Sequence, residues 1–293
     1  MKRKILEIVK GFLKLTRIEH SLMLILAVLI GELLSFNSIK EFNIKILPLI
    51  CSLLVPSFLS MSAFAINDYF DYESDRINKR FDRPLVSKVI KRDEALIISL
   101  TLFVISLYIS FFLNQIAFLI AFSLGFLSFL YSFKLKDVPL IGNVYIALCM
   151  SIPIIFGGVV AENLKQIHFL LFSIIFLAGL AREIAHSIRD YKGDSIARGS
   201  KNIVALIGKK RSAQLSFLLY LIAIFLSILV FFFYEPYKFN LIYVFFVGIC
   251  DILLFYVAFF TFNYNRTDFI KKTRNITLTA MFLALLGFFF PLL

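Results

Sequence analysis

The chain has 293 residues, 60% of them hydrophobic, and its mean hydropathy is +0.89. A membrane-spanning helix needs roughly 20 apolar residues, so this composition excludes an ordinary water-soluble protein and leaves little room for a separate soluble domain. The formal net charge of +12 would fit a nucleic-acid-binding protein only if the basic residues gathered on one soluble face.

Nine hydrophobic segments predict nine membrane-spanning helices. We therefore expect an all-α integral membrane protein in which residues 1–293 form a single transmembrane bundle. The segments cover residues 18–36, 44–66, 94–113, 115–133, 139–161, 167–188, 212–234, 240–262 and 275–293. Ahead of them, residues 1–17 begin with a basic run and continue with apolar residues at helical spacing, without a small-residue cleavage site, which predicts an interfacial amphipathic helix.

Lys and Arg are distributed very unequally between the two sides of this predicted bundle. If the N-terminus is cytoplasmic, 27 of the 31 Lys and Arg residues lie on the cytoplasmic side. Because membrane proteins retain positive charge on that side, we expect a multi-pass cell-membrane protein whose N-terminus and polar loops are cytoplasmic. The basic charge is then a signal of topology, and no nucleic-acid partner is expected.

The second predicted span continues into a run of polar residues from Asn67 to Asp75. Asp68, Asp71 and Asp75 are spaced 3 and 4 residues apart, which places their carboxylates on one face of a continuing helix. Like charges on one face repel each other, and no basic residue interrupts the run before Arg76. This cluster therefore needs a cation from elsewhere in the molecule.

A second acidic cluster follows the sixth span, where Asp190 and Asp194 are spaced 4 residues apart. Carboxylates are ligands that Mg²⁺ prefers, and Mg²⁺ commonly binds through one or two of them together with substrate phosphates. The basic residues near both clusters suit a phosphate-bearing substrate. Solvated helix ends would explain either cluster alone, but two clusters with these spacings predict a diphosphate site.

These motifs resemble those of the UbiA-type superfamily of intramembrane prenyltransferases. Asn67-Asp68-x-x-Asp71-x-x-x-Asp75 matches the first signature of that family, and Asp190-x-x-x-Asp194 matches the second. The similarity covers the whole chain, including the segment from Tyr131 to Lys136. The resemblance implies a helical bundle with a cytoplasmic cap formed by the loops after helices 2 and 6, at residues 71–93 and 189–211.

The resemblance also implies a Mg²⁺-dependent transfer of an allylic group from an isoprenyl diphosphate donor to a lipophilic acceptor. Asp68, Asp71 and Asp75 would hold one Mg²⁺, and Asp190 and Asp194 another. The expected substrate-binding residues are Asn67 beside the first metal, Tyr131 near the cation, Lys136, Lys192 and Lys201 on the diphosphate, Arg83 in the cap, and Arg17 and His20 on an anionic acceptor.

Within the superfamily, the segment from Arg182 through Asp194 to Lys201 looks most like the archaeal digeranylgeranylglyceryl phosphate synthases. That similarity implies addition of a geranylgeranyl chain to the free hydroxyl of geranylgeranylglyceryl phosphate, giving an ether bond of a membrane lipid. Lys88 is a departure, because members often carry Gly there, and it leaves the turn geometry of the first loop open.

Two other functions stay open at the level of sequence. The acceptor could be an aromatic acid such as 4-hydroxybenzoate or a naphthoate, as in quinone biosynthesis. The protein could also be a cation transporter without enzymatic activity, although transporters more often place broken helices near the bilayer midplane. Outside the two clusters, Asp251 lies within the eighth apolar segment, where we expect a hydrogen bond between packed helices.

Overall fold

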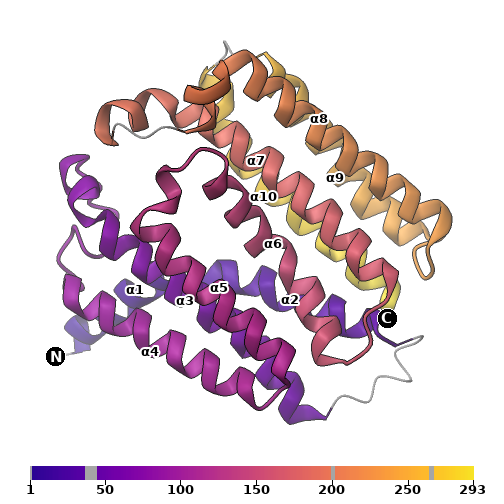
Figure 1. The fold of residues 1–293 in the computed structure, drawn as a ribbon, viewed down its shortest axis with the longest axis horizontal. Coiled ribbons are helices and arrows are strands. Elements are labelled where there is room, and N and C mark those ends of the chain that lie inside the picture. Colours follow the sequence, from indigo (N-terminus) through magenta and orange to yellow (C-terminus); the bar gives the residue numbers. More distant parts are fainter. Residues whose placement is uncertain (1, 37–44, 199–201, 264–266) are drawn as a thin grey trace. The chain divides into compact units, whose positions relative to one another are not determined.

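A computed structural model describes residues 2–36, 45–198, 202–263 and 267–293, and these residues form helices with no strand among them. They divide into two compact units, Met1–Ile25 with Ile44–Lys136 and Leu26–Asn43 with Asp137–Leu293, and we describe each unit by itself. The α-helices are α1 (Lys2–Thr16), α2 (Ile18–Leu34), α3 (Ile46–Ile77), α4 (Arg92–Phe111), α5 (Gln115–Phe133), α6 (Ile141–Val160), α7 (Gln166–Arg198), α8 (Ile203–Phe233), α9 (Leu241–Phe262) and α10 (Thr267–Phe289) (Figure 1).

Helix α1 covers the predicted interfacial segment, and α2 to α10 each overlap one of the nine predicted spans, although α3, α7, α8 and α10 extend well beyond the predicted bounds at one end. Among the described residues, eight of these helices are long and apolar enough to cross a membrane. The remaining one, α2, has 17 residues. At about 1.5 Å per residue it is roughly 26 Å long, which is slightly short of a hydrocarbon layer about 30 Å thick.

In the first unit, α4 and α5 pack along α3. Ser62 on α3 and Ser99 on α4 donate hydrogen bonds to each other's carbonyl oxygens at 2.8 and 2.9 Å, which satisfies both hydroxyls inside an apolar contact. On α5, Gly125 faces Phe103, and a Cβ at Gly125 would lie 2.1 Å from that ring. Small residues thus let these helices approach closely, as is usual for helices in membranes.

The polar end of the first unit is built around a small apolar core. Leu15 of α1, Ala65 of α3, Leu85 and Ile90 of the 78–91 loop, and Ala95 of α4 are all buried together. The loop winds through successive turns, including hydrogen bonds from the Ser87 and Val89 amides back to Arg83 and Pro84. This core fixes the end of α1 and the loop against α3.

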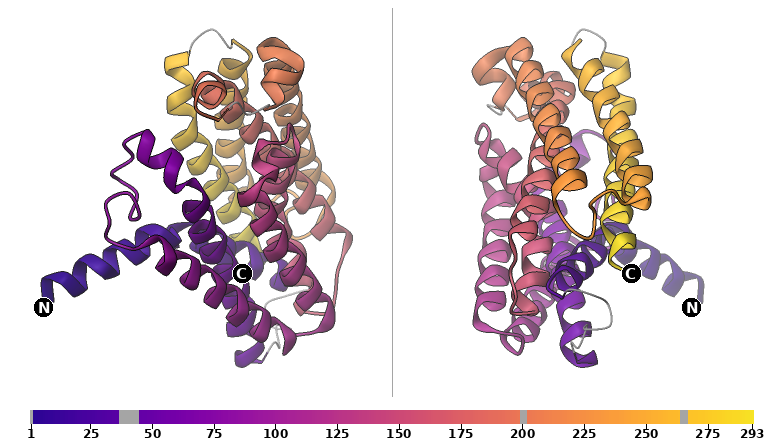
Figure 2. Two further views of the ribbon diagram at one scale, coloured as in Figure 1. Left: turned by 60° about the vertical axis from the view of Figure 1, so that its left-hand side comes forward. Right: turned by 90° about the vertical axis from the view of Figure 1, so that its right-hand side faces the viewer.

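The second unit is a bundle of α6 to α10, in which α8, α9 and α10 lie side by side in both views of Figure 2. Its polar side chains are used for packing between helices. The Tyr237 hydroxyl donates to the carbonyl oxygen of Phe288 at 2.9 Å, and Ser216 on α8 donates to the carbonyl oxygen of Ala181 on α7 at 2.8 Å. These bonds satisfy buried hydroxyls where no water is available.

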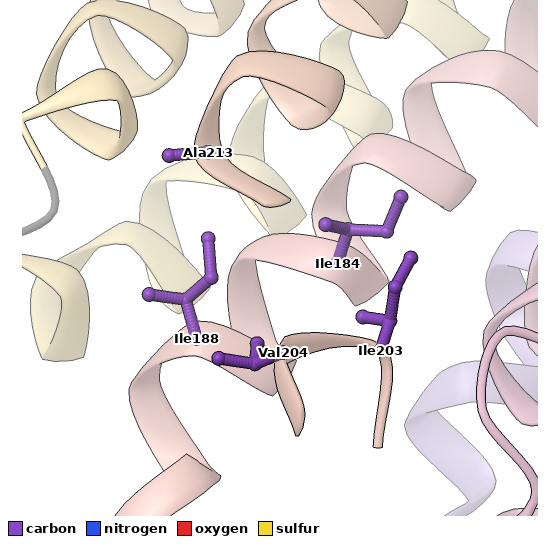
Figure 3. Close-up of a cluster of buried hydrophobic side chains, with 5 residues drawn as sticks. All are labelled: Ile184, Ile188, Ile203, Val204 and Ala213. Carbon is purple, nitrogen blue, oxygen red and sulfur yellow. The ribbon is translucent and has the colours of Figure 1, made fainter. Parts of the chain in front are cut away.

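The predicted loop over residues 189–211 is helical along most of its described length, so the connection between the two helices is much shorter than expected. Helix α7 continues through both motif aspartates to Arg198, and α8 begins at Ile203. Figure 3 shows the buried apolar cluster that joins the two helices: Ile184 and Ile188 of α7 with Ile203, Val204 and Ala213 of α8. Apolar packing on α7 thus extends to within two residues of Asp190.

Helix α8 is interrupted by a kink at Gly208, whose backbone angles are φ +80° and ψ 161°. That conformation is essentially restricted to glycine. The kink separates the first five residues of α8 from the long apolar helix that follows, so the chain turns between the second polar segment and the membrane-spanning part.

Candidate active site

The first acidic cluster lies on α3, which continues without interruption from the apolar segment to Ile77, as predicted. Asp68 and Asp75 are buried and Asp71 is half-buried. Each of the three carboxylates faces basic side chains of the first unit, so the repulsion expected from the sequence is relieved by cations from the adjoining loop and from more distant parts of the chain.

Asp68 accepts hydrogen bonds from two arginines. Nη2 of Arg17 lies 2.8 Å from Oδ1 of Asp68, and Nη1 of Arg83 lies 3.1 Å from the same oxygen. The Asp68 side chain is only 2% exposed, whereas each arginine side chain is 22% exposed. Two of the predicted substrate-binding residues are therefore held together by a predicted metal ligand.

Asp71 forms an ion pair with Lys136, which lies in the 3₁₀ turn Leu135–Asp137 that follows α5. The Asn67 amide donates to the other oxygen of Asp71 at 3.1 Å. Asp71 and Lys136 are each 14% exposed, so this pair is accessible at the edge of the unit. The structure thus brings Asn67, Asp71 and Lys136 together, as the predicted site requires.

Asp75 lies between two arginines of the 78–91 loop, 4.0 Å from Nη1 of Arg80 and 3.8 Å from Nε of Arg83. Arg80 is also bonded to Asp82, and this hydrogen bond lowers the pKa of the Asp82 carboxyl. The loop therefore presents a guanidinium to each end of the α3 cluster, through Arg83 at Asp68 and through Arg80 and Arg83 at Asp75.

The second acidic cluster is on the last turns of α7. The helix places Asp190 and Asp194 one turn apart, as the spacing predicted. The side chains of Asp190, Lys192 and Asp194 lie outside the described residues, and so does Lys201. Their predicted roles stay predictions.

Two turns before Asp190, α7 carries a polar network whose pairing the sequence did not predict. Nη1 of Arg182 lies 2.6 Å from Oε1 of Glu183, and Nδ1 of His186 lies 3.5 Å from the same oxygen. Nε of Arg182 donates to the Thr277 hydroxyl of α10 at 3.3 Å. Charged residues inside a membrane bundle often mark a functional site, so their presence was a signal in the sequence. The contact between Arg182 and Thr277 joins residues 95 positions apart, so no local spacing could predict it.

The other predicted substrate-binding residues are placed as follows. The His20 ring lies 5.2 Å from the ring of Phe64, over which Arg17 also stacks at 4.4 Å. Tyr131 is half-buried near the end of α5. A further contact that the sequence did not indicate is Arg92, whose guanidinium lies 4.5 Å from the ring centre of Tyr69 on α3.

Within the described ranges, no three side chains of Asp, Glu, His or Cys lie close enough together to hold a metal ion. The chemistry of α3 nevertheless fits a hard cation. Asp71 and Asp75 are one turn apart, with side chains 14% and 11% exposed, and Asn67 adds an amide one turn earlier. Such oxygen donors are what Mg²⁺ prefers. The side chains of Asp190 and Asp194 on α7 are outside the described residues.

Comparison with known proteins adds to this geometry. The model of the UbiA prenyltransferase family matches residues 24–290, which covers almost the whole chain. The chain belongs to the UbiA prenyltransferase family. It is therefore an enzyme of the prenyltransferase class and a multi-pass membrane protein, as the motifs predicted.

Several UbiA-family relatives extend over the full chain. A protein of Archaeoglobus fulgidus named digeranylgeranylglyceryl phosphate synthase is 39% identical over 99% of both chains. One of Korarchaeum cryptofilum with the same name is 33% identical over 94% of this chain and 95% of its own.

Solved structures agree in fold. One concerning digeranylgeranylglyceryl phosphate synthase in membranes has a TM-score of 0.76 and 31% identity over 97% of this chain and 98% of its own. A UbiA homologue of Archaeoglobus fulgidus bound to GPP and Mg²⁺ has a TM-score of 0.66 and 20% identity over 94% of this chain and 98% of its own.

Proposed function

We propose that this protein transfers a geranylgeranyl group from geranylgeranyl diphosphate to the free hydroxyl of geranylgeranylglyceryl phosphate, forming an ether bond. The observation that carries this proposal is the full-length similarity to relatives named for that product, at 39% and 33% identity. It agrees with the acceptor class expected from the sequence. The arginines on Asp68 supply the positive charge that a phosphorylated acceptor needs.

The reaction needs help for the departing diphosphate. Its developing negative charge must be neutralised, and one Mg²⁺ held by Asp71 and Asp75 of α3, with another held by Asp190 and Asp194 of α7, would supply the positive charge for this. Lys136 lies beside Asp71 and is suited to contact the same diphosphate. The predictions for Lys192 and Lys201 as further diphosphate contacts are kept as part of this proposal.

The remaining residues of the proposed site would stabilise the allylic cation and bind the acceptor. An allylic cation must be kept from water until the hydroxyl attacks, and the apolar interior of a membrane bundle provides that environment. Tyr131 would face the cation through its ring, and His20 would lie at the acceptor beside Arg17. Asn67 would support the first metal ligand, Asp71, to which it already donates.

The membrane orientation is also part of the proposal: the N-terminus and the acidic helix ends face the cytoplasm of the cell. The support is the distribution of Lys and Arg described above. The orientation is tested with two variants that lack Cys51, Cys149 and Cys250 and carry one new cysteine each, in place of Lys79 or of Asn114. A membrane-impermeant thiol reagent added to intact cells should label the Asn114 position and spare the Lys79 position; the reverse pattern would invert the topology.

The identity of the acceptor is tested by offering two candidate acceptors in separate reactions. Purified protein is given geranylgeranyl diphosphate and Mg²⁺ with either geranylgeranylglyceryl phosphate or 4-hydroxybenzoate, and products are separated by mass. We expect the ether product and diphosphate release with the glyceryl phosphate, and neither without Mg²⁺. A product formed only with 4-hydroxybenzoate would replace this function with aromatic prenylation.

A further inference from the structure

Asp68 differs from the other two aspartates of α3 in its surroundings. Its carboxylate is 2% exposed and accepts three contacts from two guanidinium groups, at 2.8 Å from Arg17 and at 3.1 and 3.5 Å from Arg83. One negative charge thus faces two positive charges. Asp71 and Asp75 are more accessible, with side chains 14% and 11% exposed.

The two arginines are held rigidly, because both come directly from the apolar core of the first unit. Arg17 follows Leu15 of that core at the break between α1 and α2, where its backbone takes a left-handed φ of +46° and its guanidinium stacks over Phe64. Arg83 precedes Leu85 of the same core. Nε of Arg83 is buried and has no hydrogen-bond partner among the described residues.

This arrangement is poorly suited to a metal ligand. A cation approaching Asp68 would meet two guanidinium groups already within hydrogen-bond distance of its oxygens, and repulsion between like charges opposes such binding. The same arrangement is well suited to an anion. Arginine presents several N–H donors in a planar fork that matches the oxygens of a phosphate group.

We infer that Asp68 is a positioning residue that holds Arg17 and Arg83 side by side as a receptor for the phosphate monoester of the acceptor, rather than a ligand of Mg²⁺. This inference rests on the proposed function. A phosphate monoester carries nearly two negative charges at neutral pH, which the two guanidinium groups complement. The donor diphosphate has a separate set of partners, since Asp71 lies three residues further along α3 and pairs with Lys136 of the 3₁₀ turn after α5.

The geometry of the acceptor supports separate binding sites for the acceptor phosphate and the donor diphosphate. In geranylgeranylglyceryl phosphate the free hydroxyl and the phosphate are on neighbouring carbons, so the receptor for the phosphate must lie close to the reacting carbon of the donor. Asp68 and Asp71 are three residues apart on α3, and at about 1.5 Å per residue their positions along the helix differ by about 4.5 Å. The hydroxyl can thus face the donor while the phosphate stays on the arginines.

The test compares the phosphorylated acceptor with its neutral analogue, geranylgeranylglycerol, using geranylgeranyl diphosphate as donor. The quantity is the ratio of kcat/KM for the two acceptors, in which the amount of folded enzyme cancels. Arg17→Gln and Arg83→Gln should each lower this ratio about 10- to 100-fold, since each removes charged hydrogen bonds. Asp68→Asn should lower it too, and the KM for the donor should stay within about 2-fold of wild type.

Arg92→Gln is the matched control, because it removes an arginine of the same unit that lies over Tyr69 instead of Asp68. It should leave the ratio unchanged. Arg17→Lys and Arg83→Lys retain charge and should give intermediate ratios if the planar fork matters. The Mg²⁺ concentration for half-maximal rate should be unchanged in Asp68→Asn and raised in Asp71→Asn.

Three results would overturn the inference. An unchanged acceptor ratio with a raised donor KM would assign the arginines to the donor diphosphate. Equal losses with both acceptors would make the Asp68 cluster purely structural. A raised Mg²⁺ requirement in Asp68→Asn would restore Asp68 as a metal ligand. If the wild-type protein makes no ether from the phosphorylated acceptor, the proposed function itself has failed, which is a distinct outcome.

Discussion

Gly31 on α2 and Gly157 on α6 bring the backbones of these two helices into direct contact. A Cβ on Gly31 would lie 2.2 Å from the carbonyl oxygen of Ile154, and a Cβ on Gly157 would lie 2.2 Å from that of Val28. Next to this crossing, Nε2 of His168 lies 2.8 Å from the carbonyl oxygen of Gly31. The crossing therefore depends on the absence of side chains at both glycines.

We expect Gly157→Ala to destabilise the protein by about 1–3 kcal/mol, because the two backbones must separate to admit a methyl group. Thermal unfolding in detergent measures the loss as a lower Tm. Gly248→Ala is the control, since the nearest atom to a Cβ there is Val244 Cγ1 at 4.0 Å. Equal Tm values for the two variants would mean that the α2–α6 crossing is not tightly packed.

The backbone of Lys88 shows the turn geometry that the sequence left open at the position where the family resemblance led us to expect Gly. Lys88 is exposed in the 78–91 loop and adopts a left-handed φ of +59°, which costs a side-chain-bearing residue about 1–2 kcal/mol. Lys88→Gly should therefore raise stability by about 1 kcal/mol, measured by thermal unfolding, with activity retained.

Lys91→Gly provides the comparison for this prediction, because Lys91 is exposed in the same loop but has an extended backbone with φ of −75°. There glycine relieves no strain and should lower stability slightly. A stabilisation at position 91 equal to that at position 88 would show that loss of a lysine charge, and not the backbone conformation, produces the effect.

The apolar segments predicted nearly the whole helical architecture, because hydrophobic length decides what can cross a bilayer. The i, i+3 and i+7 spacing likewise predicted that Asp68, Asp71 and Asp75 share a helix. Length did not predict that α7 would extend to Arg198. At residues 189–211, which were predicted to be a loop, apolar residues of α7 and α8 such as Ile188 and Val204 pack in one cluster. Such packing between helices depends on tertiary structure and cannot be predicted from the length of an apolar segment.

The sequence could not predict which charged residues of the site pair with each other. Arg17 and Asp68 are 51 residues apart, and Lys136 and Asp71 are 65 apart, so no local pattern links them. Spacing identified which residues belong to the site, but it treated the three aspartates as equivalent. Their different roles follow from burial and from the core around Leu15 and Leu85, which brings the arginines to Asp68.

Asp251 makes the hydrogen bond between helices that was expected for it. Its Oδ2 accepts from the Ser227 hydroxyl of α8 at 2.6 Å, and the Tyr243 hydroxyl donates to the carbonyl oxygen of Ser227. Ser227→Ala and Asp251→Ala should each cost about 1 kcal/mol of stability, and the double variant should cost little more than either alone. Thermal unfolding of the four proteins gives the coupling, and fully additive losses would contradict it.

The decisive prediction for the metal site concerns Asp71. Asp71→Asn keeps the volume of the side chain and its contact with Asn67, but it removes the charge needed for Mg²⁺ and for pairing with Lys136. We expect turnover to fall by about 100-fold or more, while thermal stability changes little, because the side chain lies at the edge of the unit. Transfer of labelled geranylgeranyl diphosphate to the acceptor, assayed across Mg²⁺ concentrations, measures the effect.

Glu73→Gln controls for loss of a carboxylate on the same helix. Glu73 is exposed and pairs only at the surface with Arg76 at 2.9 Å, so its removal should leave turnover within about 2-fold of wild type. Asp190→Asn on α7 should match Asp71→Asn, since both aspartates are proposed to serve one diphosphate. Full activity in both Asp71→Asn and Asp190→Asn would show that these two helices do not hold the catalytic Mg²⁺, and it would contradict the proposed chemistry of the site.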